Sequence, residues 1–164
     1  MASEAQARAA GAGGEALDDA EARRLAVESD DSVLVRAPAG SGKTELLVRR
    51  FLRLLATVEE PEQVVALTFS RKAAAEMHQR LLQALASAHG DEPRTPHERR
   101  RWELARSVLE QGGRRGWGLE QSPRRLRVLT LDALALQLVG RMPWTARASS
   151  ALQPADAAAP LYRA

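Results

Sequence analysis

The segment Ala37 to Thr44 contains the residues of this chain that are best suited to chemistry. Its sequence, Ala-Pro-Ala-Gly-Ser-Gly-Lys-Thr, follows an apolar run at Ser32 to Val35 and precedes a helical pattern from Glu45 to Leu55. In a strand–loop–helix setting, the backbone N–H groups of the loop and of the helix N-terminus converge on one spot and attract an anion. The segment therefore predicts a phosphate-binding loop.

Individual residue types within this segment have separate chemical roles. Gly40 and Gly42 let the backbone approach the phosphates, because no Cβ intervenes. Lys43 is expected to reach the β- and γ-phosphates of a nucleotide, and the Thr44 hydroxyl is expected to bind Mg²⁺, so these two are the predicted catalytic residues. The predicted nucleotide contacts within the segment are Ala37, Pro38, Ala39, Gly40, Ser41, Gly42, Lys43 and Thr44.

The scarcity of lysine supports this prediction. Only Lys43 and Lys72 are lysines among 24 basic residues, and the others are arginines. A compact ammonium on a flexible stem suits the phosphate-loop position, whereas a planar guanidinium does not. A ligand-free turn between a strand and a helix would not require this choice.

The composition is that of one globular domain. The chain has 164 residues, of which 45% are apolar and 4% aromatic, so the core should consist mainly of Leu, Val and Ala. Because there is no cysteine, disulfides, thiolate nucleophiles and cysteine metal sites are excluded. No apolar run approaches the ~20 residues of a membrane span, and we expect a cytoplasmic protein.

Charge is unevenly distributed along the chain. Residues 1–31 contain three basic and eight acidic side chains, whereas residues 94–127 contain ten arginines and four glutamates. A basic region can follow a nucleic-acid backbone, but arginines on a solvated helix face explain it equally well. The sequence leaves both interpretations open.

Helical and strand patterns alternate along the chain. We expect strands at residues 33–35, 63–69 and 126–131, and helices at residues 17–28, 45–55, 70–88, 95–111 and 132–141, with a loop at 112–118. Ser70 and Thr95 have the residue types and positions of helix N-caps. This alternation predicts an α/β fold with a parallel sheet, and a ligand site at the carboxyl end of its first strand.

Three segments resemble motifs of superfamily 1 DNA helicases of the UvrD/RecB/AddA type. The phosphate loop, with Ala37 where Gly is usual, resembles motif I. Thr68 to Met77 resembles motif Ia, and Val128 to Leu134 resembles motif Ib. The similarity runs from about Leu17 to about Trp144 and is closest to bacterial helicase–nuclease subunits resembling AddA.

The resemblance implies a P-loop NTPase (RecA-like) three-layer fold, of which this chain is an incomplete, leading part. Residues 17–144 would form the partial ATP-binding domain, after a disordered leader at 1–16 and before an irregular tail at 145–164. ATP and Mg²⁺ would be the cofactors. Single-stranded or unwinding DNA would be a partner, together with the remainder of the helicase or a nuclease subunit.

The same resemblance implies roles outside the phosphate loop. The residues that would lie along DNA are Thr68, Phe69, Ser70, Lys72 and Thr130. An aromatic face such as that of Phe69 can stack on a base, although burial in the core is the alternative for this residue. Glu21 falls near the Gln that reads adenine in the family, and a carboxylate there can accept a hydrogen bond but cannot donate one.

Three functions remain open from the sequence. The first is the ATP-binding part of a helicase, which by itself would bind ATP and perhaps DNA without turnover, because the acidic motif and second lobe of the family do not follow. The second is a complete small P-loop NTPase, in which Asp132 after the apolar run Val128 to Leu131 would bind the metal. The third is a non-catalytic nucleotide- or nucleic-acid-binding relic.

Overall fold

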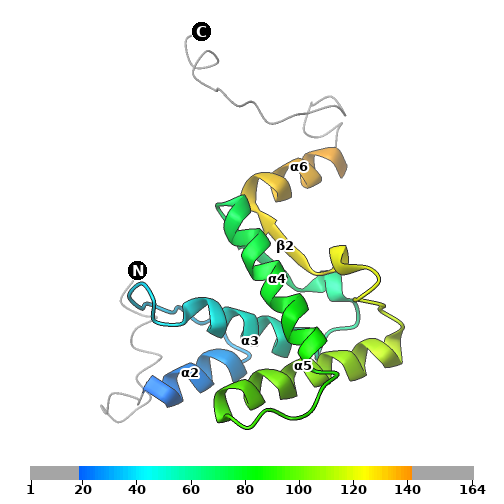
Figure 1. Cartoon of the computed structure of the whole chain (residues 1–164). Coiled ribbons are helices and arrows are strands. Elements are labelled where there is room, and N and C mark those ends of the chain that lie inside the picture. The colour runs from blue at the N-terminus through cyan, green and yellow to red at the C-terminus, as the bar shows by residue number, and fades with distance from the viewer. Residues whose placement is uncertain (1–18, 142–164) are drawn as a thin grey trace.

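A group of helices and a small parallel sheet make up residues 19–141, the part of the chain that the computed structural model describes (Figure 1). The elements are α2 (Asp19–Glu28), α3 (Lys43–Leu55), η1 (Pro61–Gln63), β1 (Val65–Thr68), α4 (Arg71–Ser87), α5 (Pro96–Arg115), η2 (Pro123–Arg125), β2 (Arg127–Thr130) and α6 (Leu131–Arg141). The leader and tail predicted at 1–16 and 145–164 lie outside the described residues. None of the helices in residues 19–141 is long and apolar enough to cross a membrane.

The two strands confirm the predicted α/β class and parallel pairing. β1 and β2 lie in register from Val65 opposite Arg127 to Thr68 opposite Thr130. The chain between them forms α4 and α5, as parallel strands require a long crossover connection. α4 packs against both strands, and Ala66 contributes to the core from the face of the sheet that α4 covers.

The prediction of a buried strand at residues 33–35 is wrong. Val33, Leu34 and Val35 are 42%, 67% and 37% exposed and belong to no sheet. A strand needs a neighbour for its backbone N–H and C=O groups. Within residues 19–141, β1 and β2 pair with each other, and the segment before the phosphate loop has no strand beside it.

The predicted end of the fourth helix is also wrong. Instead of ending near Gln111, α5 continues through two glycines to Arg115, and Gly116 ends it with a φ of +67°. A Cβ on Gly112 would meet the Trp117 ring at 3.4 Å. Gly112 therefore lies within the helix, with the Trp117 ring packed against it, and does not break the helix.

The predicted helix starts are confirmed by their caps. The Ser70 hydroxyl accepts a hydrogen bond from the Ala73 N–H at 3.0 Å, at the start of α4. The Thr95 hydroxyl accepts one from the Glu98 N–H at 3.4 Å, at the start of α5. Each cap satisfies one of the N–H groups that the first turn of a helix leaves without a partner.

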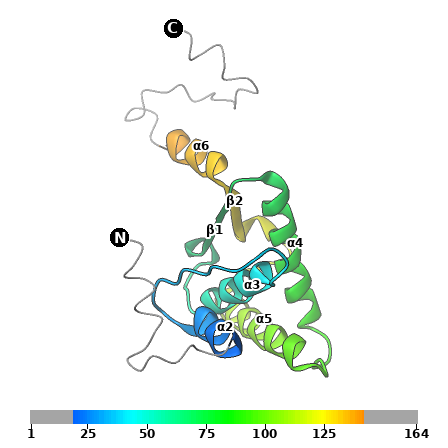
Figure 2. The same cartoon turned by 90° about the vertical axis from the view of Figure 1, so that its left-hand side faces the viewer.

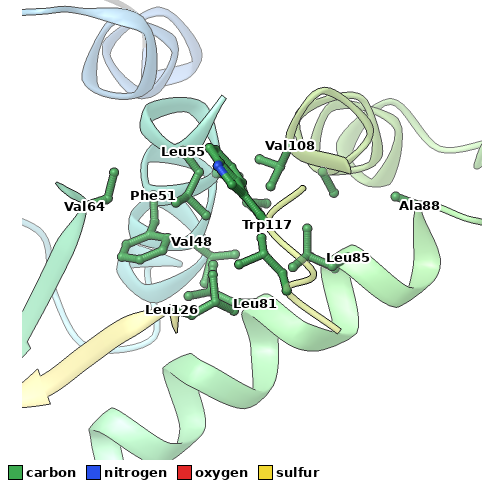
Figure 3. Close-up of a cluster of buried hydrophobic side chains, with 14 residues drawn as sticks. Val48, Phe51, Leu55, Val64, Leu81, Leu85, Ala88, Val108, Trp117 and Leu126 are labelled. Carbon is green, nitrogen blue, oxygen red and sulfur yellow. The ribbon is translucent and has the colours of Figure 1, made fainter. Parts of the chain in front are cut away.

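The main core lies between α3, α4 and α5, next to the start of β2 (Figure 3). Its largest fully buried side chains include Val48, Leu52, Leu55, Leu81, Leu85 and Val108. Trp117 closes the core after α5, and its Nε1 donates to the Glu59 carbonyl at 3.0 Å. This core holds α3 in place and, with it, the phosphate loop at its N-terminus.

Candidate nucleotide site and DNA-facing residues

The predicted phosphate loop leads directly into α3. Gly40 and Gly42 have φ values of +76° and +83°, in the left-handed region that glycine adopts without strain. Gly42 is the N-cap of α3, and its carbonyl accepts from the Leu46 N–H at 3.1 Å. The N–H groups before Leu46 in the first turn have no acceptor within the helix, so they can bind an anion.

The side chain of Lys43 is folded back on its own loop. Its Nζ donates to the carbonyls of Ala37 and Pro38, at 2.6 Å and 2.5 Å. The ammonium thus lies within the curve of the loop, next to the carbonyl of Ala37, which precedes Lys43 by six residues. A phosphate oxygen would have to compete with these two carbonyls for the lysine protons.

Ser41 is the residue of the loop with an unmet hydrogen-bonding requirement. Its Oγ is buried and has no hydrogen-bond partner among the described residues. A buried hydroxyl without a partner is costly, so a bound oxygen-rich group would stabilise it. Apart from Gly40 and its two chain neighbours, no described residue has an atom within 4 Å of a Cβ placed on Gly40. Both observations fit a phosphate group in this loop, with the exposed Thr44 in the first turn of α3 beside it.

α2 presents Arg23, not Glu21, to the loop. Nη1 of Arg23 lies 3.4 Å from where a Cβ on Gly42 would be. Glu21 is about 200° away around the helix, is half exposed, and lies 3.9 Å from Arg24. The helical spacing could have revealed this, because Arg23 shares a face with Ala26 and Val27, which are buried. The adenine-reading role of Glu21 stays a prediction.

The residues predicted to lie along DNA gather where the two strands end. Thr68 and Thr130 are register partners, and Phe69 follows Thr68 with 88% of its surface exposed. The alternative that Phe69 belongs to the core is therefore wrong. Lys72 is exposed in the first turn of α4.

Two hydroxyls of this group are already occupied as helix caps. The Ser70 hydroxyl accepts from the Ala73 N–H at 3.0 Å, and the hydroxyl of Thr130, which is buried, accepts from the Ala133 N–H at 3.1 Å. Asp132 is exposed in the first turn of α6. Among residues 19–141, no group of three or more His, Asp or Glu side chains is placed to hold a metal ion.

Most arginines of the basic region are engaged with carboxylates. Six of the ten form ion pairs: Arg99 with Glu92, Arg100 with Glu28, Arg101 with Glu45, Arg106 with Glu110, Arg115 with Glu59, and Arg125 with Glu60 and Glu62. Hydrogen bonds from Arg125 hold the pKa of Glu62 below its usual value, against the opposing effect of burial. These pairs favour the interpretation of a solvated, ion-paired surface over a continuous nucleic-acid track.

Comparison with known proteins gives a consistent result. The model of the "UvrD/REP helicase N-terminal domain" family matches residues 18–156. A curated relative, "DNA helicase IV" of Escherichia coli (strain K12), is 42% identical over 102 residues, which is 60% of this chain and 14% of that protein. An "ATP-dependent helicase/nuclease" subunit of Bacillus velezensis is 38% identical over 81 residues, which is 48% of this chain and 7% of that protein.

The corresponding helicase/nuclease subunit of Anoxybacillus flavithermus is 43% identical over 74 residues, which is 43% of this chain and 6% of that protein. The chain therefore spans a small part of the length of these relatives. No solved structure matched the chain.

Proposed function

Because the chain belongs to the UvrD/REP helicase N-terminal domain family, we propose that it is the ATP-binding leading part of a superfamily 1 DNA helicase of the helicase–nuclease subunit type. In the longer protein, ATP hydrolysis would drive movement along single-stranded DNA. Since the matched segments are at most 14% of the relatives named above, this activity would belong to the assembled protein. A DNA substrate implies a cytoplasmic location.

The observation that carries the proposal is the loop before α3. Two left-handed glycines, a buried hydroxyl on Ser41 without a partner among the described residues, and a lysine within the curve of the loop together suit a triphosphate. Ala37 to Thr44 would hold the phosphates, and the Thr44 hydroxyl would bind Mg²⁺. Bound Mg²⁺ would neutralise charge on the phosphates.

Lys43 would exchange the carbonyls of Ala37 and Pro38 for phosphate oxygens when ATP binds. The exchange replaces two neutral carbonyl acceptors by anionic phosphate oxygens, which attract the ammonium more strongly. The ammonium would then lie where negative charge gathers during phosphoryl transfer. By itself this part would bind ATP without turnover, which we assign to the longer protein.

DNA would lie across the ends of β1 and β2. Phe69 offers an almost fully exposed ring for base stacking, and Lys72 adds a positive charge in the first turn of α4. The rest of the helicase, or a nuclease subunit, is the proposed protein partner. Ser70 and Thr130 would support this surface chiefly as helix caps, because their hydroxyls bind backbone N–H groups.

Calorimetric titration of the 164-residue chain with ATP and Mg²⁺ tests the nucleotide site. Lys43→Ala is expected to weaken ATP binding at least about tenfold, since it removes a charge-assisted contact to the phosphates. The matched control is Lys72→Ala, which removes the other lysine of the chain and should leave ATP affinity unchanged. Equal ATP affinities of the wild type and Lys43→Ala would contradict the proposal. If neither protein bound ATP, the alternative of a non-catalytic relic would be favoured.

The alternative function is a complete small P-loop NTPase in which Asp132 binds the metal, and the same titrations can test it. Asp132 lies in the first turn of α6, and Figures 1 and 2 both show α6 well apart from α3, where the phosphate loop ends. We therefore expect Asp132→Ala to bind ATP as the wild type does. Hydrolysis of ATP by the isolated chain, abolished by Asp132→Ala, would establish the alternative instead.

A further inference from the structure

α2 is docked along α3 with both helices running in the same direction (Figures 1 and 2). Contacts follow one another in the same order along both segments: Arg23 lies against Gly42, Ala26 and Val27 cluster with Leu46, and Asp30 pairs with Arg53. Ala26, Val27 and Leu46 form a small buried cluster between the helices. The N-terminal half of α2 is thereby placed beside the phosphate loop.

Arg50 fixes this arrangement at the other end of α2. Its Nη1 donates to the carbonyls of Ala26 and Ser29 at 2.7 Å and 3.1 Å, and its Nη2 donates to the Asp31 carbonyl at 2.9 Å. A cation at a helix C-terminus satisfies the last carbonyls and interacts favourably with the helix dipole. The position of Arg23 is thus set by a packed and hydrogen-bonded contact between two helices.

The guanidinium of Arg23 is oriented by Asp19. Nε donates to the Asp19 carboxylate at 2.7 Å, one turn earlier on α2, and Nη1 is the atom that lies against Gly42. Gly42 is the residue from which α3 starts, so Nη1 is adjacent to the N–H groups that would hold a phosphate. The planar fork of arginine is suited to phosphate oxygens, which it can bind in pairs.

We infer that Arg23 is a second cationic contact for the phosphate chain of the nucleotide, reaching the loop from α2. This inference rests on the proposed nucleotide site and adds a residue that lies outside the loop. Lys43 binds from within the loop, where its ammonium already has two carbonyl partners, whereas Arg23 approaches from the neighbouring helix. Asp19 holds the guanidinium in place and offsets its charge until the phosphates arrive.

The test compares Arg23→Ala with Arg24→Ala in calorimetric titrations of the 164-residue chain. Arg24 is the matched control, because it is on the same helix, is similarly exposed and also pairs with carboxylates, but lies about 100° around the helix from Arg23. Arg23→Ala should weaken ATP binding about tenfold, Arg23→Lys should recover part of the loss, and Arg24→Ala should bind as the wild type. Binding of inorganic tripolyphosphate, which has no base or sugar, should be weakened by Arg23→Ala to the same degree.

Asp19→Asn separates a phosphate contact from a merely structural ion pair. If Arg23 binds phosphate, removing the neighbouring negative charge leaves ATP affinity equal or up to a few-fold higher. If the pair only supports α2, Asp19→Asn and Arg23→Ala should weaken ATP binding alike, and that result would overturn the inference.

The outcomes also distinguish this inference from the proposed site itself. A loss of ATP affinity in Lys43→Ala, with Arg23→Ala at wild-type affinity, would overturn the role of Arg23 alone. A loss for ATP without a loss for tripolyphosphate would place Arg23 on the nucleoside and equally overturn it. No effect of Lys43→Ala would remove the proposed site and this inference together. Thermal melting should be nearly unchanged in Arg23→Ala, because exposed ion pairs add little stability.

Discussion

On α3, α4 and α5 most large apolar side chains are buried or partly buried, Leu47 at 50% exposure being an exception, whereas on β1 and α6 several of the same types are half exposed. Leu52, Leu55 and Leu81 are fully buried between the helices, but Leu67 on β1 is 47% exposed and Leu138 on α6 is 51% exposed. α6 has no buried residue at all. The difference lies in what each element packs against, since leucine occurs in both regions.

Layer packing explains this contrast. Three helices can turn their apolar stripes toward one another and close a core between them. A parallel sheet buries its strands only when both faces are covered, and here α4 covers the face that carries Ala66 and Val128. Val65 and Leu67 lie on the other face, where both stay more than 40% exposed. We therefore expect stability to depend mainly on the helical region.

The largest expected effect follows from Leu52→Ala in the helical core. Because Leu52 is fully buried, the substitution removes apolar contacts and leaves a cavity, which should lower the free energy of unfolding by about 3 kcal/mol. Urea denaturation followed by circular dichroism measures this change.

Leu67→Ala is the matched control on the sheet, with the same side chain and the same substitution. We expect it to cost less than about 1 kcal/mol, because half of the leucine surface is already in water. Equal losses for Leu52→Ala and Leu67→Ala would contradict the contrast between the two regions.

A smaller, pH-dependent effect is expected where the sheet meets the helices. Arg125, the last residue of η2, binds Glu62 at 2.7 Å and donates to the Trp117 carbonyl at 2.9 Å. Arg125 lowers the pKa of Glu62 in the folded state. The pair therefore contributes its full stability at pH values above the ordinary pKa of 4.5, and this contribution is lost as the pH falls through the lower folded pKa.

Glu62→Gln should therefore lower stability at pH 7 by at most about 1 kcal/mol, since the carboxylate is more than one-third exposed and screened by solvent. It should also reduce the loss of stability on acidification, measured as urea midpoints at pH 7 and below the folded pKa of Glu62. An identical acid dependence in the wild type and Glu62→Gln would refute the pairing.

The smallest expected effect on stability is that of Phe69→Ala. With 88% of its surface exposed, the ring contributes little to folding, and the melting temperature should stay the same. If Phe69 stacks on a base as proposed, single-stranded DNA binding measured by fluorescence anisotropy should weaken by about 1–3 kcal/mol. If Phe69→Ala lost stability but kept its DNA affinity, Phe69 would be a folding residue and not a DNA contact.

Local features of the chain were predictable because they depend on residues close in sequence. The caps at Ser70 and Thr95 each involve a hydroxyl and an N–H three residues later, and both form as expected. The glycines of the phosphate loop likewise take the conformation that their own backbone preferences allow.

Features that depend on distant partners were not predictable in the same way. The apolar run at residues 33–35 had the composition of a strand, but a strand exists only with a hydrogen-bonded neighbour, and among residues 19–141 none lies beside it. α5 continues past Gly112, against which Trp117 packs, although the two glycines in sequence suggested a loop. Phe69 could have been buried or exposed, and packing left it exposed.

The sequence by itself determined the type of chemistry predicted for the phosphate loop, because glycines, a lysine and a threonine at this spacing form a local motif between two elements. It also determined the family resemblance and most of the helices. Only the tertiary structure decided which residue of α2 lies against that loop. The packing of Ala26 and Val27 on α3 turns Arg23 toward Gly42 and turns Glu21 away from it. Spacing within a helix defines its faces, but only contact with another helix decides which face meets the site.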